Sequence, residues 1–231
     1  MTNHRVNVTC PPPLKCINSP KFSKSFTLSE VLITLGVIGI MAALTLPTVI
    51  SKYKRKSVET KLAKFYSVMN EAVKMSIAEH GEIEFDTAHR ESINNAEYIE
   101  QWYKENLTKY IKTLKWEGAD KSNQYFRAVF ADGTSFSSYL SGGQDFVISA
   151  LWIFYCTRDY KNCKKDGFDG ESQFLFRYEP NKRMIVPEYE DRPLDVIISS
   201  CKQPNKGSRH GCSAWIEQNG WKIPEDYPWI R

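Results

Sequence analysis

The chain contains an uncharged apolar segment that is long enough to cross a membrane. Residues 31–50 carry no charged side chain. At about 1.5 Å of rise per residue, a helix of this length matches a hydrocarbon core of about 30 Å. An ordinary secretory signal has a shorter apolar core of about 7–15 residues, followed by a small-residue cleavage site. Here Met41, Ala42 and Ala43 lie inside the apolar run. The pattern therefore predicts a membrane-spanning helix.

The apolar pattern then becomes that of an amphipathic helix, with Lys and Glu on the opposite face. Its apolar stripe consists of Val58, Leu62, Phe65, Tyr66, Met69, Val73 and Ile77. Pro47 is expected to kink the helix without ending it, because a bilayer-embedded helix tolerates one missing N–H. Gly81 is expected to end it as a C-terminal cap. Residues 26–80 are thus predicted to form one long helix, whose second half needs a sheet to pack on.

The rest of the chain predicts a second helix and then antiparallel strands. The helix is expected over residues 92–114. Asp132 and Gly133 form a hairpin signal between two expected strands. The strands are predicted over residues 126–131, 135–140, 146–157, 173–178 and 183–186, with 194–200 as a further candidate; the period of 146–157 also allows a short helix. This order indicates an α+β fold.

Basic residues gather on both sides of the apolar segment. Residues 1–25 hold Arg5, Lys15, Lys21 and Lys24 and no acid. Without these four, the 31 basic residues fall to 27 and balance the 27 acidic ones, so the net charge of +4 belongs to this leader. The basic residues at 52 and 54–56 are interpreted as a helix surface facing lipid headgroups, with a DNA-binding patch as the alternative. No nucleic-acid partner is expected.

The start of the apolar segment resembles the processing signal of type IV prepilins and type II secretion pseudopilins. The matching residues are Lys24, Phe26, Thr27, Leu28, Glu30 and Pro47. The resemblance is specific over about residues 24–53. The chain departs from the pattern at Ser25, where the family usually has Gly, because the prepilin peptidase cuts after a residue with almost no side chain.

This resemblance implies a maturation route and a set of partners. A prepilin peptidase would cut between Ser25 and Phe26, and the new amine of Phe26 would be methylated. Glu30 would pair with that amine in a neighbouring subunit, because an unpaired carboxylate in an apolar core is unfavourable. The alternative is that Glu30 only snorkels toward water. The implied partners are other pilin-like subunits, the peptidase, an inner-membrane assembly platform and membrane lipid.

The resemblance also divides the chain and places it in the cell. The expected parts are a cytoplasmic leader (1–25), a membrane half of the helix (26–50), its amphipathic continuation (51–80) and an extracytoplasmic α+β domain (81–231). The leading function is a subunit of a secretion pseudopilus or pilus-like filament, in a single-pass inner-membrane protein. The alternatives are a membrane-anchored binding or adhesion domain, as in a minor pilin, and an anchored enzyme.

Four of the six cysteines lie beyond the apolar segment. Cys10 and Cys16 belong to the leader. An even number in an oxidising space suggests two disulfides. Of the three possible pairings, we expect the locally closed one, because short loops close most readily. It joins Cys156 to Cys163 and Cys201 to Cys212. Zinc bound by these thiols with His210 is the alternative, although no C-x-x-C pair is present.

Neither a catalytic motif nor an EF-hand is present. The chain has no G-x-S-x-G, Walker loop, G-x-G-x-x-G or H-E-x-x-H, so an enzyme is not expected. Asp166, Asp169 and Glu171 have the residue types of a calcium loop, and major pseudopilins bind calcium in a loop. Their spacing favours a solvated turn and no cofactor, with calcium as the alternative.

The C-terminal segment is rich in tryptophan. Trp215, Trp221 and Trp229 are expected to pack onto the domain, because large aromatic side chains are mostly buried. The alternative is a surface for glycans or for a neighbouring subunit. An adhesion function would be favoured if these rings and Tyr155 formed an exposed cluster.

Overall fold

The computed structural model describes residues 27–83, 95–111, 113–119, 124–142 and 148–230. It is an α+β protein with a long helix, α1 (Leu28–His80), and one antiparallel sheet. The chain forms two compact units, residues 1–46 and 47–231, which are described separately. The predicted fold class is confirmed.

The described part of the first unit is the apolar half of α1. Its large apolar side chains, from Leu28 to Leu46, are all exposed. The hydroxyls of Thr34 and Thr45 donate to the carbonyls of Val31 and Met41, so these polar groups are paired within the helix. By length and composition this helix is able to cross a membrane. Pro47 lies inside α1 and does not end it, whereas the kink expected there stays a prediction.

The sheet of the second unit is a simple meander. Its strands are β1 (Thr113–Ala119), β2 (Phe126–Phe130), β3 (Ser135–Gly142), β4 (Ile148–Cys156), β5 (Gln173–Glu179) and β6 (Met184–Pro187). Each strand pairs antiparallel with the next along the chain. The β2–β3 turn contains Gly133 at φ 82°, and the Asp132 carboxylate accepts the Thr134 N–H at 3.1 Å. The predicted hairpin at Asp132 and Gly133 is confirmed.

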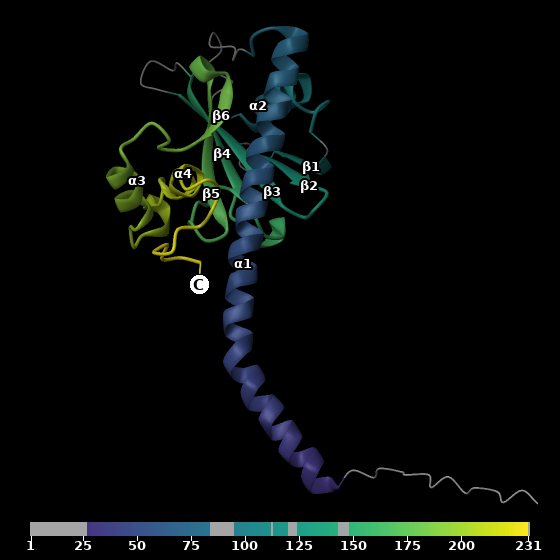
Figure 1. Cartoon of the computed structure of the whole chain (residues 1–231). Coiled ribbons are helices and arrows are strands. Elements are labelled where there is room, and N and C mark those ends of the chain that lie inside the picture. Colours follow the sequence, from purple (N-terminus) through teal and green to yellow (C-terminus); the bar gives the residue numbers. More distant parts are fainter. Residues whose placement is uncertain (1–26, 84–94, 112, 120–123, 143–147, 231) are drawn as a thin grey trace, which may run out of the picture. The chain divides into compact units, whose positions relative to one another are not determined.

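The core lies between the sheet and the amphipathic half of α1. Figure 1 shows this half of the helix crossing the sheet. Leu62, Phe65 and Met69 are fully buried. The Phe65 ring stacks on Tyr155 of β4 at 4.0 Å between centroids and meets the edge of Phe176 of β5 at 5.0 Å. The predicted apolar stripe therefore packs on the sheet. Gly81 follows the helix at φ 89°, as expected of a C-terminal cap.

The second helix is shorter than the predicted range 92–114. Helix α2 (Ala96–Asn106) begins after Asn95, whose side chain accepts the N–H groups of Glu97 and Tyr98. It ends because Thr108 gives both its N–H and its hydroxyl to the Tyr103 carbonyl, at 2.8 and 2.9 Å. The prediction was therefore wrong for residues 107–111, which follow the helix, and for Thr113 and Leu114, which lie in β1.

The segment 194–200, interpreted as a candidate strand, is a helix, and that interpretation was wrong. Helix α3 (Leu194–Cys201) follows Pro193, and α4 (Cys212–Gln218) packs beside it. The apolar residues do not alternate between two faces as a strand requires. Ile197 and Cys201, four positions apart, are fully buried, whereas Leu194 and Val196 are exposed. This spacing is that of a helix.

Candidate functional site

The candidate assembly residue, Glu30, lies in the first turn of α1 and is bonded to Thr27. The Glu30 carboxylate oxygen Oε2 accepts the Thr27 N–H at 2.9 Å and the Thr27 hydroxyl at 3.0 Å. In return, the Glu30 N–H donates to Thr27 Oγ1 at 3.2 Å. This reciprocal pattern is a capping box, which satisfies N–H groups that the first turn leaves without partners. Sequence reasoning missed it, although the T-x-x-E spacing signals it.

The cap leaves part of the Glu30 carboxylate available. Among the described residues, its second oxygen, Oε1, accepts no hydrogen bond. The side chain is exposed, at the helix end where a negative charge is favoured by the helix dipole. Glu30 is therefore able to cap its own helix and to accept a further donor at the same time. Ser25 and Phe26, the predicted processing residues, lie outside the described residues.

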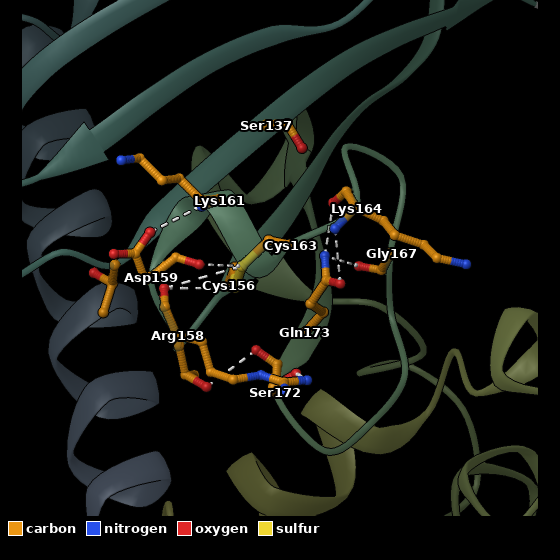
Figure 2. The surroundings of a disulfide bond; sticks show 12 residues. Ser137, Cys156, Arg158, Asp159, Lys161, Cys163, Lys164, Gly167, Ser172 and Gln173 are labelled. Carbon is orange, nitrogen blue, oxygen red and sulfur yellow. Dashed lines mark hydrogen bonds between the residues drawn. A yellow bond between two sulfur atoms is a disulfide. The ribbon is translucent and has the colours of Figure 1, made fainter.

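Both predicted disulfides are present. Cys201–Cys212 joins α3 to the start of α4, and both cysteines are fully buried. Cys156–Cys163 ties the end of β4 to the loop that follows it (Figure 2). These bonds leave no thiolate at the four positions, so the zinc alternative is wrong.

Beyond the disulfide, the rest of the segment between β4 and β5 is held in place by polar side chains (Figure 2). Gln173 of β5 accepts the Lys164 N–H at 3.1 Å and donates to the Lys164 carbonyl at 2.7 Å. Asp169 accepts the N–H groups of Glu171, Ser172 and Gln173 at 2.8–2.9 Å. Burial raises the pKa of the Asp169 carboxyl, but these hydrogen bonds together lower it below its ordinary value.

The calcium alternative receives no support from this arrangement. Asp166 and Glu171 are exposed, while Asp169 is occupied by the backbone of its own turn. Nowhere in the described ranges do three or more His, Cys, Asp or Glu side chains gather in a way that suits a metal ion. His210, the remaining candidate ligand for zinc, contacts the rings of Phe168 and Tyr189 at 4.7 and 5.6 Å.

The tryptophans of the C-terminal segment pack onto the domain, as expected. Trp215 of α4 is 5% exposed. The Trp221 ring contacts Tyr66 of α1 at 4.8 Å. The Trp229 indole donates to the Cys201 carbonyl at 2.7 Å, and the Arg209 guanidinium lies 3.2 Å from its ring centroid. Tyr155 belongs to the core. These rings do not form the exposed cluster that would favour adhesion.

A clasp between α1 and the last residues was not foreseen from the sequence. The Arg55 guanidinium donates to three backbone carbonyls, those of Ile223 at 2.9 Å, Pro224 at 2.8 Å and Ile230 at 3.1 Å. One turn later, the Glu59 carboxylate accepts the Ile223 N–H at 3.0 Å. We call these contacts the Arg55 clasp. It holds the C-terminal segment against the start of the amphipathic half of α1.

Comparison with known proteins identifies the second unit. Residues 48–230 match the model of a family of unknown function, DUF6613. No curated protein and no solved structure matches the chain. The family match begins near the end of the apolar segment, so it covers the α+β unit and leaves out residues 24–47, on which the resemblance to prepilins rests.

Proposed function

We propose that this chain, which belongs to the DUF6613 family, is a pilin-like subunit. Its apolar segment inserts it into the inner membrane, a prepilin peptidase removes residues 1–25, and the mature protein joins a type II secretion pseudopilus or type IV pilus-like filament. The subunit acts mechanically and carries out no catalysis.

The observation that carries this proposal is the apolar half of α1 with a single, partly satisfied carboxylate at its start. A continuous row of exposed large apolar side chains, from Leu28 to Leu46, has to be covered by something other than water. Lipid covers it before assembly, and the same segments of neighbouring subunits cover it in a filament. An apolar helix surface that lipid covers first and neighbouring subunits cover later suits a subunit that leaves the membrane for a filament.

Glu30 gives this assembly its register. In a bundle of apolar helices, an unpaired carboxylate costs several kcal/mol, so an arrangement that pairs it is strongly preferred. Cleavage after Ser25 creates an amine on Phe26, and a neighbouring subunit brings that amine to the carboxylate. The second oxygen, which accepts no hydrogen bond among the described residues, is able to receive it without breaking the Thr27 cap.

The disulfides support an extracytoplasmic place for the second unit. Disulfides persist in oxidising compartments and are rare in the cytosol. Both bonds lie in this unit, beyond the apolar segment. An exported α+β unit on a membrane helix agrees with a pilin-like subunit.

The test is the N-terminus of the mature protein. The full chain is expressed with a prepilin peptidase, and the membrane fraction is sequenced from its N-terminus. We expect a start at Phe26, faster processing for Ser25→Gly and blocked processing for Ser25→Leu, because the cleavage site requires a small residue. An intact Met1, or a start within residues 41–46, would overturn the proposal in favour of a permanent anchor or a secretory signal.

A further inference from the structure

A pocket of about 440 Å³ lies in the second unit, where α1 meets the loop after β4 and the C-terminal segment. Helix α1 contributes Tyr53, Lys54 and Lys61, the loop contributes Arg158, and the C-terminal segment contributes Trp229. Its volume falls in the range of about 300–1,000 Å³ that is typical of small-molecule sites. Neither the family match nor the proposed filament function assigns it a role.

The wall of this pocket is cationic. It contains three basic side chains and one carboxylate, that of Glu171. Lys61 donates to the Thr157 carbonyl at 2.7 Å and is fixed in the wall. Arg158 bonds to the Ser172 hydroxyl (Figure 2) and lies 3.7 Å from Asp169. Lys54 forms no hydrogen bond or ion pair with any described residue. The pocket therefore suits an anion, and Lys54 is free to bind it.

Two aromatic side chains in the wall are suited to a membrane surface. Tyr53 and Trp229 are amphipathic rings of the kind enriched at the level of lipid headgroups. Val49 and Ile50 are exposed apolar residues of α1 that precede Tyr53, and they belong to the second unit. Tyr53 follows Ile50 by three positions, which is about 5 Å along a helix. The pocket thus begins where the apolar segment ends.

We propose that this pocket binds the phosphate-bearing headgroup of an anionic phospholipid. Lys54 and Arg158 contact the phosphate, while Tyr53 and Trp229 flank the junction between headgroup and acyl chains. The proposal rests on the membrane span of the proposed function, and it is independent of cleavage and filament assembly. A soluble phosphate ester shares the charge of the headgroup but lacks the acyl chains that the aromatic side of the pocket would contact.

Binding is tested on the full chain in zwitterionic detergent micelles by native mass spectrometry. The three probes are short-chain phosphatidylglycerol, short-chain phosphatidylcholine and glycerol phosphate. We expect saturable binding of phosphatidylglycerol only. Lys54→Gln should weaken this binding about fivefold, because one basic residue near an anionic lipid surface contributes about that factor. Lys54→Arg should retain it.

Lys52→Gln is the matched control, because Lys52 is an exposed lysine of the same helix outside the pocket wall. Equal weakening by Lys52→Gln and Lys54→Gln would mean diffuse attraction to the basic helix surface and would overturn the proposal. Equal binding of glycerol phosphate and phosphatidylglycerol would assign the pocket to a soluble phosphate and overturn the lipid.

Vesicle flotation separates this proposal from the proposed function. The full chain is mixed with vesicles of phosphatidylcholine alone. A chain that floats, together with selective binding of phosphatidylglycerol in micelles, supports both the membrane span and the pocket. A chain that floats but does not discriminate between the lipids overturns only the pocket. A chain that does not float would overturn the membrane span and, with it, the proposal that the pocket binds a lipid headgroup.

Discussion

The side-chain amide of Asn70 pairs with both backbone polar groups of Ile185, which lies 115 positions away. Asn70 Nδ2 donates to the Ile185 carbonyl at 2.9 Å, and its Oδ1 accepts the Ile185 N–H at 2.8 Å. Ile185 belongs to β6, an outer strand of the sheet. Asn70, 6% exposed, thereby covers part of an edge that would otherwise invite pairing with another chain.

Removing the Asn70 side chain should destabilise the second unit. Asn70→Ala leaves a buried N–H and a buried carbonyl of Ile185 unpaired, and we expect a loss of about 2–4 kcal/mol in the free energy of unfolding. The measurement is urea denaturation of the full chain in micelles. Lys74→Ala, an exposed change on the next turn of α1, should stay within about 0.5 kcal/mol. Equal effects of the two variants would contradict a role for the Asn70–Ile185 pair.

Charge and capping at Glu30 are separable by substitution. Glu30→Gln keeps an acceptor for the Thr27 donors but loses the negative charge, whereas Thr27→Ala keeps the charge but loses the cap. We expect Glu30→Gln to insert into the membrane and fail to enter filaments. Thr27→Ala should still assemble, with the helix start weakened by about 1 kcal/mol. The measurement is the ratio of filament to membrane protein. Normal assembly of Glu30→Gln would refute pairing with an amine and leave only the cap.

Loss of the Arg55 clasp should release the C-terminal segment. Arg55→Ala removes hydrogen bonds from a charged donor to three carbonyls, so we expect the second unit to lose about 2 kcal/mol or more. Hydrogen exchange should rise at residues 223–230. The control is Lys56→Ala. Lys56 is exposed, and its ion pair with Glu59 is long, at 3.9 Å, so it contributes little to stability. Unchanged exchange in Arg55→Ala would show that apolar packing alone holds the segment.

His210 should make the stability of the second unit pH-dependent. Burial lowers the pKa of its imidazole below the ordinary value of 6.5. The stability that the neutral His210 side chain contributes is therefore fully present above pH 6.5. It is lost as the pH falls toward the lower pKa of the folded state. Burial raises the pKa of Glu188 and Glu217, which acts in the opposite direction on acidification. The informative measurement is the difference in Tm between His210→Gln and the unchanged chain at pH 7.5 and 5.5. We expect a relative gain for His210→Gln at the lower pH, and a constant difference would contradict this account.

The two disulfides should differ in their accessibility to a reductant. Cys201 and Cys212 are at most 1% exposed, whereas Cys163 is partly exposed. Under native conditions, a mild thiol should therefore reduce Cys156–Cys163 first, as measured by alkylation and peptide mapping. Replacing both cysteines of either bond with serine should cost about 2–4 kcal/mol. Equal reduction rates would contradict control by burial.

Sequence reasoning succeeded where the signal is local. The Asp132-Gly133 turn, the stripe from Val58 to Val73 and the short cysteine loops each carry their own pattern. It failed at α3, where a short run of apolar residues fits a strand or a helix, and at the end of α2, where the Thr108 hydroxyl stops the helix.

The candidate functional residues also differ in how far along the sequence their partners lie. Glu30 was proposed as a site residue because a lone carboxylate at the start of the apolar segment is itself a signal, and its role in assembly stays a prediction. Its Thr27 partner lies only three residues away. The Arg55 clasp, the Asn70–Ile185 pair and the cationic pocket join segments more than 90 positions apart. Nothing in the pattern around Arg55 or Asn70 names the distant backbone groups that each one binds.

The Arg55 clasp constrains the order in which this protein folds during and after its synthesis. A ribosome makes the amphipathic half of α1 early, yet the carbonyls that Arg55 binds belong to residues 223–230 and are made more than 160 residues later. The meander is able to form hairpin by hairpin as it emerges, since every strand pairs with its neighbour in sequence. The apolar stripe of α1 has no such local partner, so it cannot dock until the strands on which it packs have been made. Until the sheet has formed, this half of the helix exposes its apolar stripe to aggregation, and its docking is expected to be the last and slowest step of folding.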